Sequence, residues 1–281
     1  AVDDALMGMT DVIRGDDHLS NTPKQIVVYN ALGFEVPKFY HVPMINNPEG
    51  KKLSKRDGAM DVMDYKNQGY LPEALLNFLV RLGWSNGDQE IFSMEEMLEL
   101  FDPSNINKSA SSYNAEKLLW LNSEYIKAVS NDRLIEELKF FDLDLSHHPK
   151  RTELLDLGKQ RAQTIVELKK SITDIIDVPT SYEEAGVKKF IKEDTKDFLE
   201  KYLVLLEENK DNLYDPLKIE EFTKPFISEN NLKFPQLFQP IRIALTGGTQ
   251  APSVYDIISI LGFIEVSNRL NEALKRNFQN S

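Results

Sequence analysis

Residues 43–58 have the sequence PMINNPEGKKLSKRDG, in which the cations from Lys51 to Arg56 surround the hydroxyl of Ser54. Proline and glycines bracket the run, so we expect residues 50–58, here called the basic loop, to be a surface loop. Its ammonium and backbone N–H groups can converge on phosphate oxygens. A solvated basic loop or a localisation patch is the competing interpretation, because short basic runs are common.

The residues before the basic loop carry alternating strand and helix signals. Residues 10–14 predict a short strand, because β-branched residues precede a polar turn. Thr22 is placed to cap the helix that follows, with a proline in its first turn. Residues 38–45 predict a second strand. This order indicates an α/β segment with a parallel sheet, and we expect Arg14 and Lys55 at the ligand-binding ends of its strands.

Residues 61–130 change to helical patterns. Residues 72–82 predict a helix whose apolar stripe we expect in the core, and it consists of Leu75, Leu76, Leu79 and Leu82. Ser93 and Glu96 have the spacing of a capping box at the start of another helix. Residues 114–122 predict a third helix, in which we expect the apolar run around Trp120 to pack into the core.

The patterns of residues 131–281 are almost wholly helical, and prolines separate the segments. The expected segments are residues 134–141, 153–176 (one helix or two), 187–209 (two), 218–230, 236–245, 254–261 and 268–278. No repeat of 20–50 residues is visible, which argues against a solenoid. His147 and His148 lack a third ligand nearby, so we expect a surface turn there and not a metal site.

The composition limits the classes of function. The formal net charge of −12 weakens a nucleic-acid-binding interpretation, but a locally basic face can still hold an RNA. There is no cysteine, which excludes a thiolate zinc site and fits a cytoplasmic protein. No apolar run approaches a membrane span, and the first residues lack a secretory pattern. We expect a monomer.

Three separated motifs resemble bacterial glutamyl-tRNA synthetases, which are class I aminoacyl-tRNA synthetases. The core of the basic loop, KLSKR, is similar to the Lys-x-Ser-Lys-x signature of that class, and the string from Tyr40 to Arg56 is similar to its glutamyl version. The strings GYLPEALLNFLVRLGWS and EKLLWLNSEYIK resemble the family's stem-contact segment. The third motif, QPIRIALTGGTQAP at residues 239–252, resembles a late motif of the helical half.

The resemblance implies a fold class and a domain order. Residues 1–60 would be an α/β remnant of a Rossmann-type catalytic domain, residues 61–130 a mainly α stem-contact domain, and residues 131–281 an all-α anticodon-binding region. Two subdomains, at about 131–175 and 176–281, are an open alternative for that region. The family's His-x-Gly-His motif is absent, so we expect this chain to be the C-terminal part of a longer polypeptide and inactive alone.

The resemblance also implies a reaction, in which glutamate and ATP give glutamyl-AMP and the glutamyl group passes to tRNA(Glu). ATP would act with Mg²⁺. The implied catalytic residues are Lys52, Ser54, Lys55 and Arg56, and the implied ATP-binding residues are Asp17, His41, Met44, Ile45 and Lys55. Arg14 would bind the glutamate carboxylate, since its planar fork suits bidentate contacts. An ordinary ion pair with Asp16 or Asp17 is the alternative for Arg14.

The implied anticodon-binding residues are Arg161, Arg242, Thr246, Pro252 and Val254. Arg161 matches an arginine that reads the third anticodon base, and a salt bridge to Glu153 or Asp156 is its competing interpretation. Two other functions stay open at this point. One is a non-catalytic tRNA-binding module, and the other is a non-discriminating enzyme that also charges tRNA(Gln).

Overall fold

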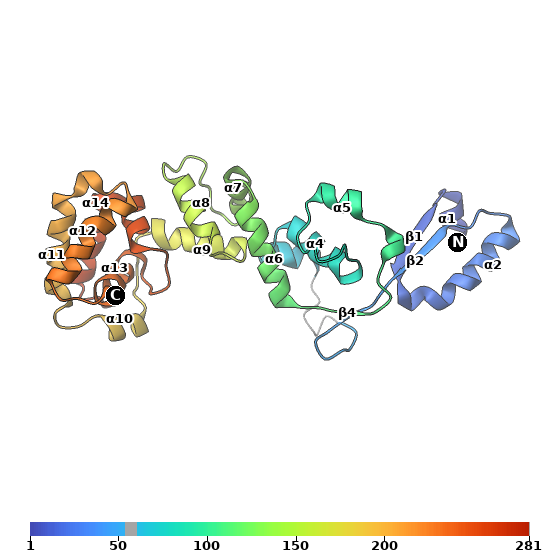
Figure 1. Ribbon diagram of the computed structural model, residues 1–281, viewed down its shortest axis with the longest axis horizontal. Helices are drawn as coiled ribbons and strands as arrows, with labels where there is room; N and C mark the ends of the chain where they lie inside the picture. The colour runs from blue at the N-terminus through green and yellow to red at the C-terminus, as the bar shows by residue number, and fades with distance from the viewer. Residues whose placement is uncertain (54–60, 281) are drawn as a thin grey trace. The chain divides into compact units, whose positions relative to one another are not determined.

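The structure of the protein, a computed structural model, describes residues 1–53 and 61–280 (Figure 1). The chain divides into two compact units, Ala1–Ala128 and Val129–Ser281. The expected further divisions, at residue 60 and near residue 175, stay predictions. No helix of the described ranges is long and apolar enough to cross a lipid bilayer.

The first unit begins with a parallel strand pair joined through a helix (Figure 1). After α1 (Val2–Leu6), strand β1 (Asp11–Gly15) pairs in parallel with β2 (Lys38–Val42), and the 3₁₀ helix η1 (Asp16–Asn21) and α2 (Thr22–Leu32) connect them. The predicted strand–helix–strand unit is confirmed. The expectation that Thr22 caps α2 is wrong, because Asn21 holds the cap position and no side chain caps this helix.

The predicted strand over residues 38–45 is interrupted at Pro43. Proline has no N–H to donate to a neighbouring strand, so β2 ends at Val42 and a separate two-residue strand, β3 (Ile45–Asn46), follows. Strand β3 pairs in parallel with β4 (Ser111–Ser112), which comes from much later in the unit. The basic loop therefore starts from β3, which does not belong to the β1–β2 pair.

The helical part of the first unit packs around one apolar cluster. It contains α3 (Val62–Asn67), α4 (Pro72–Gly83), α5 (Met94–Leu100), η3 (Pro103–Asn105) and α6 (Ala115–Ala128). The buried cluster consists of Tyr65, Leu75, Phe78, Leu82, Leu118 and Leu121. Leu76, Leu79 and Trp120 were expected in the core but are 40%, 46% and 39% exposed. The reason is that Leu75, Phe78 and Leu82 share the buried face of α4, and Leu76 and Leu79 lie outside it.

Polar contacts fix the loops of this part. The predicted capping box of α5 is confirmed, because Glu96 N–H donates to Ser93 Oγ and Ser93 N–H donates to the Glu96 carboxylate. Fully buried Asn77 accepts hydrogen bonds from Phe92 N and Tyr125 Oη, both at 2.8 Å. Burial of an amide costs little free energy when its hydrogen bonds are satisfied. Because Asn77 loses these bonds if the loop moves, its contacts favour a single path of the loop.

Helices are the regular elements of the described part of the second unit (Figure 1). Its elements are α7 (Asn131–Phe140), α8 (Arg151–Lys159), α9 (Ile165–Ile176), α10 (Glu184–Phe190), α11 (Thr195–Glu208), η4 (Lys210–Asn212), α12 (Pro216–Glu229), α13 (Phe234–Thr246) and α14 (Val254–Lys275). Residues 153–176 thus form parts of two helices. The two helices expected after residue 253 are the two parts of α14, which the non-helical backbone of Gly262 separates. Gly262 has φ 72° and ψ 170°, a conformation that is essentially limited to glycine.

A buried arginine joins three helices of the second unit. Arg269, on α14, is 3% exposed, and its guanidinium donates to the carbonyl oxygens of Ile175, Ile176 and Leu245. These oxygens belong to the last turns of α9 and α13, where helices leave acceptors without intrahelical partners. Glu265 accepts from Arg269 Nε at 2.7 Å. The interaction fixes the end of α9 against the end of α13.

Candidate functional site

The first group of predicted site residues lies at the carboxyl ends of β1 and β2. Arg14 on β1 is in register with His41 on β2. Arg14 Nη2 donates to Thr22 Oγ1 at 2.8 Å, and Thr22 Oγ1 lies 2.9 Å from His41 Nε2. A neutral His41 with its proton on Nδ1 fits this arrangement, because the hydroxyl can then accept from Arg14 and donate to His41. The buried hydroxyl of Thr22 thus connects the two side chains.

No carboxylate forms an ion pair with Arg14 within residues 1–53 and 61–280. The expected alternative, a pair with Asp16 or Asp17, is therefore not observed, and Asp17 instead lies 3.7 Å from Lys52 Nζ. The Arg14 guanidinium lies 5.2 Å from the centre of the Phe39 ring, and its buried Nε has no hydrogen-bond partner. Arg14 is therefore held by Thr22 and has no acidic partner among the described residues.

The described start of the basic loop is anchored to β3. Asn47 N donates to Lys51 O at 2.7 Å, and Lys51 N donates to the Asn47 side chain at 2.9 Å. Leu53 N donates to Ile45 O at 2.9 Å. These contacts form a turn that brings Lys52 beside Asn46. Ser54, Lys55 and Arg56, three of the four predicted catalytic residues, lie outside the described residues.

The other predicted ATP-binding residues have mixed surroundings. Met44 is half-buried, and its carbonyl accepts a hydrogen bond from Ser111 N. Ile45 packs against the apolar cluster of α4 and α6. Asp17 is exposed and its charge is partly compensated by Lys52. Contact of these residues with adenine or phosphate stays a prediction.

The second group of predicted residues surrounds residues 247–252, here called the 247–252 loop, which connects α13 to α14. Arg161, just after α8, donates from Nη1 to Ala251 O at 2.9 Å. Arg242, on α13, donates from Nη2 to Pro252 O at 3.2 Å. The structure therefore brings together two arginines that are far apart in sequence, on the carbonyl oxygens of consecutive residues.

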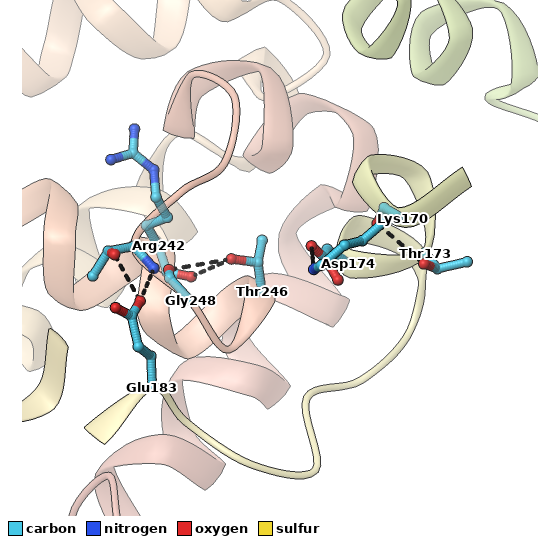
Figure 2. Close-up of polar contacts among 8 residues, drawn as sticks. Lys170, Thr173, Asp174, Glu183, Arg242, Thr246 and Gly248 are labelled. Carbon is cyan, nitrogen blue, oxygen red and sulfur yellow. Dashed lines mark hydrogen bonds and ion pairs between the residues drawn. The ribbon is translucent and has the colours of Figure 1, made fainter. Parts of the chain in front are cut away.

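The remaining predicted anticodon residues have less free surface. The Thr246 hydroxyl donates to Arg242 O at 2.9 Å and lies 3.5 Å from Gly248 O (Figure 2). Pro252 and Val254 are buried, and Val254 is only 2% exposed. Their side chains shape the loop from inside, and a direct contact between the Val254 side chain and a nucleotide is not favoured in this structure.

Neither arginine of the second group has an acidic partner among the described residues. Glu153 and Asp156, the alternative partners of Arg161, pair with Lys150 at 3.0 Å and Lys159 at 2.9 Å. Burial, and then repulsion from the Arg161 charge, lower the pKa of Arg242 from its ordinary value. The charge of a guanidinium persists under such shifts. Two cations that donate to one loop and have no acidic partner in the described residues form an anion-attracting surface on an acidic protein.

A shallow pocket of about 340 Å³ lies beside these arginines. It is lined by Arg161, Glu167, Lys170, Ser171, Asp174, Gln250, Ala251 and Pro252. Lys170 is neutralised by Asp174 at 2.6 Å, so Arg161 is the lining cation without a counter-charge in the described residues (Figure 2). Such a pocket suits an unpaired base edge or a phosphate.

Two contacts of these sites could not be read from local patterns. Thr22 has the sequence context of a helix cap, and only the strand register places its hydroxyl between Arg14 and His41. Glu183 accepts from Thr249, which is 66 residues away. No motif or spacing signals that contact, and only pairwise covariation among homologues would have found it.

Two models of known protein families match this chain, and each match includes one of the two groups of predicted site residues. Residues 1–120 match the class I tRNA synthetase (E and Q) catalytic domain, and residues 114–274 match an anticodon binding domain. The chain belongs to the class I tRNA synthetases for glutamate and glutamine. Arg14 and its neighbours lie within the catalytic-domain match, and Arg161 and Arg242 lie within the anticodon-domain match. The fold class expected from the sequence is confirmed.

Individual synthetases are similar to this chain over nearly its whole length. Glutamate–tRNA ligase 1 of Aliarcobacter butzleri is 87% identical over 281 residues, which are 100% of this chain and 60% of the relative. Glutamate–tRNA ligase 1 of Campylobacter hominis is 54% identical over 98% of this chain and 59% of its own length. A glutamate–tRNA ligase structure from Elizabethkingia meningosepticum superposes with a TM-score of 0.84 at 29% identity, covering 98% of this chain and 58% of that one. The chain thus spans about three fifths of these synthetases.

Proposed function

We propose that the protein to which this chain belongs is a glutamate–tRNA ligase. It would activate glutamate with ATP to glutamyl-AMP and transfer the glutamyl group to the 3′ end of tRNA(Glu). The observation that carries the proposal is the 87% identity to such a ligase over all 281 residues. The two arginine groups support it, because each presents a cation without an acidic partner in the described residues, one suited to a carboxylate and one to RNA.

In the activation step, the cations of the basic loop would neutralise the charge that develops on the transferring phosphates. Lys55 is the proposed principal cation, because a compact ammonium on a flexible stem can follow the β- and γ-phosphates. Lys52, Ser54 and Arg56 would support it. Lys52 already lies near Asp17, so its contribution to the positive potential is partly compensated. Catalysis of this kind depends on positioning and electrostatics and needs no covalent intermediate with the protein.

We propose that Mg²⁺ enters this site together with ATP. The described residues contain no group of three or more histidine, aspartate or glutamate side chains that could hold a metal by themselves. Mg²⁺ commonly retains water and takes phosphate oxygens as ligands. The triphosphate and water would therefore supply most of its ligands. His41, Met44 and Ile45 are proposed to line the nucleotide side of this site.

Arg14 is proposed to bind the carboxylate of glutamate. The guanidinium is planar and offers parallel N–H donors, which match the two oxygens of a carboxylate. Arg14 Nη2 donates a hydrogen bond to Thr22 Oγ1, and no acidic residue of the described chain forms an ion pair with Arg14. This arrangement limits the motion of the side chain and so reduces the entropy lost on binding.

Arg161 and Arg242 are proposed to contact the anticodon of tRNA(Glu), with Arg161 favouring C over G at the third anticodon base. An arginine fork can read unpaired base edges, and its charge also favours nearby phosphates. This assignment favours a discriminating enzyme over one that also charges tRNA(Gln). We further propose that the protein is cytoplasmic and acts as a monomer.

Glutamate-dependent exchange between ATP and pyrophosphate tests the activation step. In a full-length ligase that carries these residues, Lys55→Ala should lower kcat for exchange by about 10²–10³-fold, since one transition-state contact is lost. The affinity for tRNA should change little. Lys51→Ala, which lies outside the KLSKR signature, is the matched control and should retain most of the rate. An unchanged exchange rate in Lys55→Ala would remove Lys55 from the site. Absence of glutamate-dependent exchange in the wild type, both with and without tRNA(Glu), would refute the proposed function.

A further inference from the structure

Glu183 holds the 247–252 loop at two points. Its carboxylate oxygen Oε2 accepts hydrogen bonds from Thr249 N at 2.8 Å and from Thr249 Oγ1 at 2.6 Å (Figure 2). Its backbone N–H donates to Gly247 O at 2.8 Å. One residue thus fixes both the start and the middle of the loop, although its own side chain is exposed to solvent.

The fit between the loop and the segment around Glu183 is close. Gly247 has φ +79°, and a Cβ there would lie 2.8 Å from Ser181 O. A Cβ on Gly186 would lie 2.6 Å from Thr249 Cγ2. The two glycines therefore permit an approach that side chains would block, and the Glu183–Thr249 contact closes that approach.

The two candidate RNA-binding arginines rest on the same loop, further along the chain. Arg161 and Arg242 donate to Ala251 O and Pro252 O, which are two and three residues after Thr249. In Figure 2 the Arg242 guanidinium extends away from Glu183. Glu183 and the arginines contact separate parts of the loop, so the carboxylate can fix the loop without neutralising either cation.

We propose that Glu183 is a positioning residue for RNA recognition, which sets the 247–252 loop so that Ala251 O and Pro252 O hold Arg161 and Arg242 in one arrangement. This inference rests on the proposed anticodon-binding function of those arginines. A carboxylate near a polyanion costs affinity through repulsion. The Glu183 carboxylate offsets this cost, because its one oxygen accepts from two donors of Thr249 and so fixes the loop.

The test uses the 281-residue chain and two RNA probes, the anticodon stem-loop of tRNA(Glu) and the same stem-loop with G at the third anticodon base. The measured quantity is the ratio of their dissociation constants. Glu183→Ala should reduce this ratio by about threefold to tenfold, the range that corresponds to one or two lost hydrogen bonds. Glu183→Gln should keep most of the ratio, because the amide oxygen can accept from the same two donors.

Glu184 provides the matched control. It is exposed, adjacent in sequence and of the same charge, and its side chain has no hydrogen bond or ion pair with the described residues of the loop. Glu184→Ala removes the same repulsion without touching Thr249, so its ratio should equal that of the wild type. If Glu183→Ala changes the affinity for both probes by the same factor, or leaves the ratio unchanged, the positioning role is overturned.

A second measurement separates failure of this inference from failure of the proposed function. Amide hydrogen exchange at Thr249 in the RNA-free chain reports the Glu183 contact directly, and Glu183→Ala should accelerate it by about threefold to tenfold. If the wild type does not distinguish the two RNA probes, anticodon reading by this chain is refuted. Unchanged exchange at Thr249 in Glu183→Ala would refute the loop contact itself, whatever the RNA result.

Discussion

Arg161 and Arg242 hydrogen-bond to the carbonyl oxygens of consecutive residues, Ala251 and Pro252. The contacts place two like charges close together, and burial, followed by repulsion from Arg161, lowers the pKa of Arg242. Such an arrangement is unfavourable in isolation, since like charges repel and the Arg242 Nε is buried without a partner. An anionic ligand would relieve the repulsion, which connects this geometry with RNA binding.

Replacing Arg161 by glutamine should relax selection between tRNA(Glu) and tRNA(Gln). Loss of one bidentate base contact is worth about 1–3 kcal/mol, or roughly 5- to 150-fold in kcat/KM discrimination. The measurement is aminoacylation of both tRNAs by a full-length ligase with these residues. Lys201→Gln, an exposed position on α11, removes one positive charge elsewhere and should not alter selectivity. Unaltered selectivity in Arg161→Gln would assign Arg161 to structure.

Replacing Thr22 by valine should weaken glutamate binding. Valine keeps the shape of the side chain but removes the hydroxyl between Arg14 and His41, so the Arg14 guanidinium loses its anchor. We expect the KM for glutamate to rise about threefold to tenfold, with a smaller change in the KM for ATP. Thr22→Ser retains the hydroxyl and should restore the wild-type value. An unchanged KM for glutamate in Thr22→Val would contradict the anchoring role of Thr22.

Replacing Arg269 by methionine should destabilise the second unit by about 3 kcal/mol or more. The substitution leaves buried carbonyl oxygens at the ends of α9 and α13 without a donor and leaves Glu265 without its partner. Thermal or denaturant unfolding measures the change. Lys275→Met, at an exposed position of the same helix, should change the free energy of unfolding by less than about 0.5 kcal/mol. Similar stabilities of the two variants would contradict the assigned role of Arg269.

The Glu183 carboxyl should titrate below an ordinary glutamate. The hydroxyl of Thr249 and then its backbone N–H lower the Glu183 pKa. Because the folded-state pKa is depressed, the contact is complete above the unfolded-state value and is lost as the pH falls through the folded-state pKa. Carboxyl ¹³C chemical shifts from pH 2 to 7 give the midpoint. Thr249→Val should raise the midpoint of the Glu183 titration. A midpoint that Thr249→Val leaves unchanged would refute the contact.

The sequence predicted most of the helices because their signals are local. The capping box of Ser93 and Glu96 marked the start of α5, and the prolines separated the helices of the second unit. The apolar stripe of α4 was assigned less well. Its leucines at 76 and 79 are exposed while Phe78 and Asn77 are buried, since the buried face depends on which helix packs against it.

The residues of the candidate sites were predicted from family resemblance, and their surroundings were not. Spacing could not show that the Thr22 hydroxyl contacts both Arg14 and His41, because the parallel register of β1 and β2 makes that contact. It also could not show that Glu183 approaches Thr249. Contacts of this kind depend on tertiary geometry, and each side chain involved is unremarkable in its local sequence.

The two arginines of the second unit are held by main-chain oxygens, which has a consequence for divergence among related synthetases. A carbonyl oxygen is present whatever side chain its residue carries, so substitutions at Ala251 leave the acceptor of Arg161 in place. Position 251 can therefore drift through many residue types while the placement of Arg161 is inherited. Sequence comparisons that score only side-chain identity will therefore underestimate the role of position 251 in holding Arg161. At this position selection can act on the conformation of the backbone.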